Sequence, residues 1–195
     1  MTDKTPEPKT TPKTTGENQL PGDLSPRQMI ERMIRVDHAG EYGAARIYRG
    51  QLDILGDRHP MTATIRHMED QEQRHLKTFD EMIVNRNVRP TALAPFWHVA
   101  GYALGAATAL MGPKAAMACT AAVEEAIDEH YAAQIEDLGE DEKDLRDTIS
   151  DFRAEEAEHR QTALEHGAED TPGYGLMSAG IKAGCKFAIW LSERV

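Results

Sequence analysis

Hydrophobic positions recur at three- and four-residue intervals through most of this chain and are broken by glycine and proline, a pattern typical of α-helices. Ser25-Pro26 supplies a cap followed by proline at the first helical position, and Gly112-Pro113 and Gly167 mark later breaks. No segment shows sustained two-residue alternation, so no strand is predicted and the expected fold class is all-α. Six helices are predicted, over about residues 25–56, 61–87, 96–111, 114–138, 142–166 and 173–195.

Two of these predicted helices are unusually apolar. Residues 97–123 carry a single charged side chain, Lys114, and contain a Gly-x-x-x-Gly motif at 101–105, which the last helix repeats at 180–184. Small residues at this spacing permit close helix packing, and an apolar surface also suits a membrane interface, so both interpretations stay open here. A membrane-spanning helix is not expected, because Gly112-Pro113 interrupts an apolar run that would need about 20 residues.

The first 24 residues differ in composition from the rest of the chain. They contain six Thr, four Pro and three Lys but no aromatic residue, so they cannot bury enough surface to offset the entropy of ordering. We interpret residues 1–24 as a disordered tail and residues 25–195 as one folded domain. The tail has neither the apolar core of a secretory signal nor the acid-poor composition of a transit peptide, which favours a bacterial cytoplasmic protein.

Charge and cysteine content exclude several classes of function. The 33 acidic and 22 basic residues give a net charge of −11, which argues against a nucleic-acid partner because phosphate binding needs a basic surface. Cys119 and Cys185 lack the paired spacing of a disulfide framework or a thiolate metal site.

Two Glu-x-x-His motifs carry the most specific chemical signal. Among eight histidines, only His75 and His159 follow a glutamate by three residues. A further glutamate precedes each motif at a similar distance, 31 residues from Glu41 to Glu72 and 32 residues from Glu124 to Glu156. The chain therefore looks like a duplicated helix pair. Two more pairs match at equal offsets from the upstream glutamates, Tyr48 with Tyr131 and Gln51 with Gln134.

This spacing suits a metal site. Residues three apart on a helix project from one face, so each motif presents a carboxylate and an imidazole to the same region. The upstream helices each add one glutamate, which completes the ligand set of ferritin-like di-iron and di-manganese bundles. Four ionised glutamates in a core would repel one another, whereas two divalent cations cancel their charge. We predict a ferritin-like four-helix bundle with internal duplication and additional apolar helices, and metal ligands Glu41, Glu72, His75, Glu124, Glu156 and His159.

Residues near these ligands allow more than one interpretation. Tyr48 and Tyr131 fall two turns beyond their glutamates, where they could donate hydrogen bonds to ligands or pack as ordinary core aromatics, and packing is the default. His130 is ambiguous in the same way. Three glutamates are assigned to solvent or to interhelix pairs, because a step of one or two residues turns them toward other faces: Glu125, Glu155 and Glu158.

Five segments resemble the demethoxyubiquinone hydroxylases of ubiquinone biosynthesis: residues 35–44 (RVDHAGEYGA), 70–75 (DQEQRH), 118–125 (ACTAAVEE), 152–159 (FRAEEAEH) and 183–194 (AGCKFAIWLSER). The similarity covers about residues 25–195. It implies a di-iron monooxygenase that uses O2 to hydroxylate the ring of a polyprenylated demethoxyubiquinone or demethoxyubiquinol. It carries the ligation of two iron ions onto the same six residues. It also implies NADH or another reductant, with His130 and Tyr131 taking part in electron transfer.

The resemblance changes the interpretation of the apolar helices. An isoprenoid-tailed substrate resides in the bilayer, so these helices are expected to form an apolar entrance that lies on the membrane surface. The implied location is peripheral, on the cytoplasmic side of the bacterial inner membrane. A homo-oligomer and a lipid-binding partner protein of the ubiquinone pathway stay open as further partners.

Two other functions compete with this one. A ferritin-like iron-storage or peroxide-scavenging protein would use the same ligands, but it has no evident need for the uncharged region 97–123. A non-enzymatic helical scaffold would need none of the six ligands.

Overall fold

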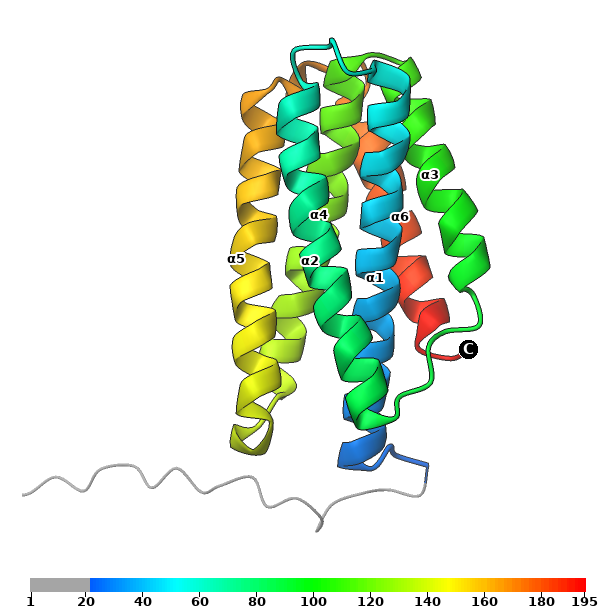
Figure 1. Ribbon diagram of the computed structural model, residues 1–195, viewed down its shortest axis with the longest axis vertical. Helices are drawn as coiled ribbons and strands as arrows, with labels where there is room; N and C mark the ends of the chain where they lie inside the picture. The colour runs from blue at the N-terminus through cyan, green and yellow to red at the C-terminus, as the bar shows by residue number, and fades with distance from the viewer. Residues whose placement is uncertain (1–21) are drawn as a thin grey trace, which may run out of the picture.

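The computed structural model describes residues 22–195 as a bundle of helices that run along one long axis (Figure 1). No strand occurs within residues 22–195, so the predicted all-α class is confirmed. The predicted tail, residues 1–24, lies outside the described residues apart from its last three positions. The six α-helices are α1 (Pro26–Leu55), α2 (Thr62–Arg86), α3 (Ala94–Leu110), α4 (Pro113–Asp137), α5 (Lys143–Glu165) and α6 (Tyr174–Ser192), and two short 3-10 helices are Glu140–Glu142 and Ala168–Asp170.

Local sequence signals set the helix ends. At the start of α1, the backbone N–H of Gln28 donates to Ser25 Oγ, and the backbone N–H of Ser25 donates to Gln28 Oε1 at 2.9 Å. This reciprocal cap satisfies amides that have no partner within the helix. Gly56 and Gly167 follow α1 and α5 with φ of +73° and +83°, a region that favours glycine. The predicted boundaries agree closely with these, although α6 ends at Ser192 before the end of the chain.

Four helices, α1, α2, α4 and α5, form the central bundle. One apolar cluster joins Ile34, Phe79 and Ile149 at one end of it. A second cluster joins Leu52 and Ile65 with small residues of α4 at the other end. The predicted ligand positions lie between these clusters along every one of the four helices, so the bundle holds its polar centre between two apolar layers.

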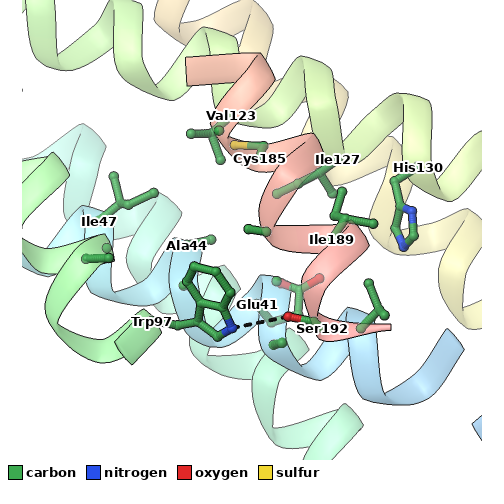
Figure 2. Close-up of a pocket in the computed structure, with 18 of the residues that line it drawn as sticks. Glu41, Ala44, Ile47, Trp97, Val123, Ile127, His130, Cys185, Ile189 and Ser192 are labelled. Carbon is green, nitrogen blue, oxygen red and sulfur yellow. Dashed lines mark hydrogen bonds between the residues drawn. The ribbon is translucent and has the colours of Figure 1, made fainter. Parts of the chain in front are cut away.

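The remaining helices, α3 and α6, cover one side of the bundle, away from α5 (Figure 1). Trp97 on α3 donates from Nε1 to Ser192 Oγ at the end of α6, with 3.1 Å between the atoms (Figure 2). This hydrogen bond ties the two outer helices together. No helix within residues 22–195 combines the length and the apolar character that crossing a membrane requires.

The two Gly-x-x-x-Gly motifs have different structural roles. A Cβ on Gly105 would overlap the backbone carbonyl oxygen of Ile47, and a Cβ on Gly101 would lie 2.8 Å from the carbonyl oxygen of Gly43. A Cβ on Gly180 or Gly184 would meet nothing within 4 Å. Close packing therefore explains the glycines of α3, whereas the glycines of α6 border open space.

We expect Gly105→Ala to destabilise the fold, because the added methyl group would press on backbone atoms of α1. Overpacking of this kind costs about 1–3 kcal/mol, which urea denaturation would detect as a lower free energy of unfolding. Gly180→Ala is the matched control, and it should raise the free energy of unfolding by roughly 0.5–1 kcal/mol because alanine favours a helix. Equal effects of the two changes would contradict the close approach of α3 to α1.

Candidate metal centre

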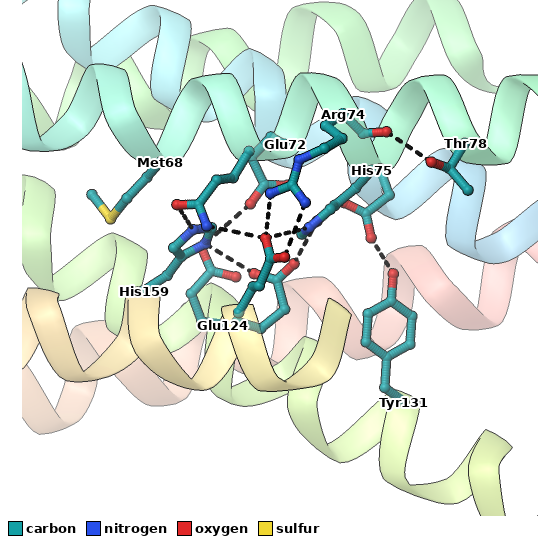
Figure 3. A network of polar contacts seen from close by, with 12 residues as sticks. Met68, Glu72, Arg74, His75, Thr78, Glu124, Tyr131 and His159 are labelled. Atoms are coloured by element: carbon teal, nitrogen blue, oxygen red, sulfur yellow. Dashed lines mark hydrogen bonds and ion pairs between the residues drawn. The ribbon is translucent and has the colours of Figure 1, made fainter. Parts of the chain in front are cut away.

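The six predicted ligands converge at the centre of the bundle. They form two groups that share Glu72 and Glu156, and the potential ligand atoms of each group lie within 4.8 Å of one another (Figure 3). All six residues are at most 2% exposed. The structure therefore brings together every residue of the predicted set, and their role as metal ligands stays a prediction. The groups are Glu41, Glu72, His75 and Glu156, and Glu72, Glu124, Glu156 and His159.

The carboxylates of this cluster fit a pair of cations. Both oxygens of Glu72 and one oxygen each of Glu41, Glu124 and Glu156 are buried and accept no hydrogen bond. Buried polar atoms without partners are costly, so a cluster of them indicates a ligand that binds oxygen. Carboxylate oxygens together with imidazole nitrogens suit iron or manganese.

The protonation of the cluster reflects the same crowding of negative charge. Burial and the charge of Glu156 raise the pKa of Glu72 and of Glu124 well above the usual range of a carboxyl group. Burial alone would lower the pKa of His75, but the neighbouring carboxylates of Glu156 and Glu41 outweigh burial and raise this pKa to about 10. Protons therefore offset part of the negative charge, and bound cations would displace them.

The two imidazoles are oriented alike. His75 Nδ1 and His159 Nδ1 both face inward, each 3.1 Å from an oxygen of Glu156. The outer nitrogen of each ring meets an acceptor on the neighbouring helix, since His75 Nε2 lies 3.0 Å from Glu155 Oε2 and His159 Nε2 lies 3.1 Å from Gln71 Oε1. A histidine that binds metal through one nitrogen usually donates from the other, which sets its tautomer. This arrangement leaves Nδ1 of both rings facing the centre, as the predicted ligand role requires.

Sequence reasoning missed these outer acceptors. Gln71 was not predicted to have a role, and Glu155 was assigned to solvent or to an interhelix pair. Glu155 does form such a pair, with Arg74 at 2.6 Å, and this guanidinium holds the pKa of Glu155 down at about 2, but the same carboxylate also reaches His75. Each acceptor directly precedes the glutamate of a Glu-x-x-His motif, and that position within the repeat was the available signal.

The other two glutamates assigned to solvent or to interhelix pairs agree with the structure. Glu125 pairs with Lys182 of α6 at 2.8 Å and with Arg160 of α5 at 3.5 Å. Glu158 is exposed.

Tyr48 and Tyr131 connect the two repeats. The hydroxyl of Tyr48 donates to Glu124 Oε1 at 2.6 Å. The hydroxyl of Tyr131 donates to Glu41 Oε1 (Figure 3). Each phenol thus binds the upstream glutamate of the other repeat. Burial and these carboxylates raise the pKa of both phenols, which remain protonated donors. Core packing alone, the default prediction, is therefore an incomplete description of both tyrosines.

His130 marks a difference between the repeats. Its Nε2 lies 3.1 Å from Oδ1 of the buried Asp37, which also accepts a hydrogen bond from Gln134 at 2.7 Å. Ile47 of the first repeat is equivalent to His130, and Thr120 of the second repeat is equivalent to Asp37. The imidazole–carboxylate pair therefore belongs to one side of the centre.

An apolar pocket of about 370 Å³ opens on that side, between α1, α3, α4 and α6. Glu41, His130 and Tyr131 lie in its wall, among aliphatic side chains that include Ile127 and Ile189 (Figure 2). Five glycines also line it, and a Cβ on four of them would meet no atom within 4 Å: Gly40, Gly43, Gly180 and Gly184. The pocket therefore joins an apolar volume to Glu41, one of the predicted metal ligands.

We expect Glu124→Ala to bind fewer metal ions than the two that the intact set would hold. Glu125→Ala is the matched control, and it should retain full metal binding with a stability change below about 1 kcal/mol, because it removes only interhelix ion pairs. Elemental analysis of both proteins purified from iron-replete cells checks the difference. Loss of metal from Glu125→Ala alone would show that the wrong glutamate had been assigned.

Comparison with known proteins identifies the family. The family model described as ubiquinone biosynthesis protein COQ7 matches residues 28–192. A 3-demethoxyubiquinol 3-hydroxylase of Rhodospirillum rubrum is 56% identical over 181 residues, which cover 93% of this chain and 85% of the relative. A mitochondrial NADPH-dependent 3-demethoxyubiquinone 3-hydroxylase of Bos taurus is 54% identical over 173 residues, with coverage of 87% and 79%. The resemblance inferred from sequence motifs is thereby confirmed, and the chain belongs to the COQ7 family of ubiquinone biosynthesis proteins.

Proposed function

We propose that this protein is a di-iron monooxygenase that hydroxylates the ring of a polyprenylated demethoxyubiquinol or demethoxyubiquinone in ubiquinone biosynthesis. The similar proteins are named for this reaction. The observation that carries the proposal is the apolar pocket, because it leads to Glu41 and so to the cluster of buried glutamates and histidines.

Two iron ions per chain would be held by the six clustered residues, with Glu72 and Glu156 available to both. When bound, the iron pair supplies the redox chemistry that activates O2. Hydroxylation inserts one oxygen atom into a ring C–H bond and releases the other as water, so it also consumes two electrons and two protons. NADH or NADPH is the reductant class that we assign, in agreement with the NADPH-dependent names of several relatives.

The pocket suits both parts of the substrate. Its aliphatic and glycine-lined walls would bind an isoprenoid tail by burying apolar surface. We assign the ring to the end where Glu41, Tyr131 and His130 lie, since these side chains supply the polar groups there. Asp37 holds His130 in place, where its imidazole can exchange hydrogen bonds with a bound ring, and we assign electron transfer to His130 and Tyr131.

We propose that the mouth of the pocket contacts the membrane surface, where an isoprenoid-tailed substrate resides. Phe96 and Val99 on α3 are 59% and 66% exposed, and Phe187 and Trp190 on α6 are 59% and 49% exposed. Large exposed apolar side chains of this kind suit peripheral insertion, here on the cytoplasmic side of the bacterial inner membrane. A second copy of the chain or a lipid-binding partner protein would be expected to use the same face.

Iron storage or peroxide scavenging is the alternative function. It would use the same ligands, but its small substrates need no apolar volume beside Glu41. The pocket therefore favours hydroxylation.

A hydroxylation assay tests the proposal directly. Protein loaded with iron is supplied with a demethoxyquinol of defined tail, a nicotinamide reductant and O2, and products are separated by mass. We expect a product heavier by one oxygen atom, which carries the label when 18O2 is used. Consumption of O2 that yields only water or peroxide would favour the alternative.

We expect Gly184→Leu to discriminate between substrates by tail length, because the new side chain would enter the pocket. The KM for a long-tailed quinol should rise roughly tenfold, with a smaller change for a short-tailed analogue. Gly175→Leu is the matched control, because Gly175 also lies on α6 with open space around it but does not line the pocket. Equal effects on both tail lengths would argue against tail binding at this wall.

A further inference from the structure

The two imidazoles of the metal centre are supported by chemically different groups. Glu155 Oε2 accepts from His75 Nε2 at 3.0 Å, whereas Gln71 Oε1 accepts from His159 Nε2 at 3.1 Å. Glu155 and Gln71 occupy the same position in the two repeats, one residue before the motif glutamate. The duplication therefore places an anionic acceptor behind one histidine and a neutral acceptor behind the other.

Contacts around Glu155 hold its carboxylate in one orientation. Arg74 donates from both terminal nitrogens, at 3.0 Å to Oε1 and 2.6 Å to Oε2 (Figure 3). Gln71 Nε2 donates to Oε2 at 3.0 Å, so it links the two outer acceptors. Glu158 stands where Arg74 stands in the other repeat, and it is exposed. The charged arrangement therefore occurs behind His75 and not behind His159.

His75, the histidine with the anionic acceptor, belongs to the side of the centre that faces the pocket. His75 groups with Glu41, and Glu41 lines the pocket together with Tyr131. His159 groups with Glu124, whose donor is the buried Tyr48. The anionic acceptor thus supports the histidine of the group that includes Glu41, in the wall of the pocket.

We propose that Glu155 is a positioning residue for His75 and makes the two metal positions unequal, with tighter binding at the position beside the pocket. The inference rests on the proposed two-metal site. An anionic acceptor strengthens the hydrogen bond from Nε2 and raises the basicity of the opposite nitrogen, so Nδ1 of His75 becomes the stronger ligand. Gln71, which carries no charge, orients His159 with less effect on its basicity.

The test measures metal binding without turnover. Metal-free protein is titrated anaerobically with Co(II) alone, followed by calorimetry and by the visible absorption of the bound ion. Wild-type protein should bind two ions with separate affinities. In Glu155→Gln, which keeps the shape and the hydrogen bond, the tighter affinity should fall about 10–100-fold and the absorption should change, while the weaker affinity is retained.

Two further variants separate electronic support from structural support. Glu158→Gln makes the same charge change on the same helix, and it should leave both affinities as in wild type. The exchange variant, Gln71→Glu with Glu155→Gln, moves the carboxylate behind His159 and should restore one tight position. If Glu155→Gln lost the tighter metal affinity and the exchange variant did not regain it, Glu155 would serve only to join α2 and α5 through Arg74. That result would overturn the inference.

Two other outcomes are decisive. If Glu155→Gln bound two ions with the affinities of wild type, the inference would be wrong while the two-metal site would stand. If wild-type protein bound fewer than two ions, the two-metal site itself would be wrong, and the inference would fail with it.

Discussion

Crowding of negative charge at the centre of the bundle is the constraint on which the rest of the structure depends. Four glutamates belong to two groups that share Glu72 and Glu156, and within each group the potential ligand atoms lie within 4.8 Å of one another. Several of the carboxylate oxygens accept no hydrogen bond. Such a core is unfavourable unless protons or cations offset the charge. The apolar clusters at either end and the close approach of α3 to α1 provide the packing that holds these carboxylates together.

Duplication explains the connections around this centre, and departures from it explain where the reaction is expected. Each buried phenol binds the glutamate of the other repeat, so neither half is complete without its partner. The repeats differ at His130 and Asp37, which stand on the pocket side, and at Glu155, which supports His75. These departures lie on the side of the centre where Glu41 borders the pocket.

One glycine spacing serves two purposes in the outer helices. On α3 it permits backbone contact with α1, because a Cβ on Gly105 would overlap Ile47. On α6 it removes side chains from the wall of the pocket at Gly180 and Gly184. Helix packing creates the apolar volume, and missing side chains keep it open. The resulting pocket connects an apolar surface to a buried polar centre, as a hydroxylase of a tailed quinol requires.

The sequence by itself determined the helical fold, the helix boundaries and the six residues of the centre, because helix periodicity and a repeated Glu-x-x-His spacing are local or regular signals. It also pointed to the COQ7 family. Only the tertiary structure decided which neighbours reach those residues. Glu155 and Gln71 directly precede two glutamates of the centre, and helix geometry alone predicts that their side chains point away from it. The partner helix brings His75 and His159 to them. The pocket lies between four helices that are far apart in sequence, and no local pattern encodes their contact.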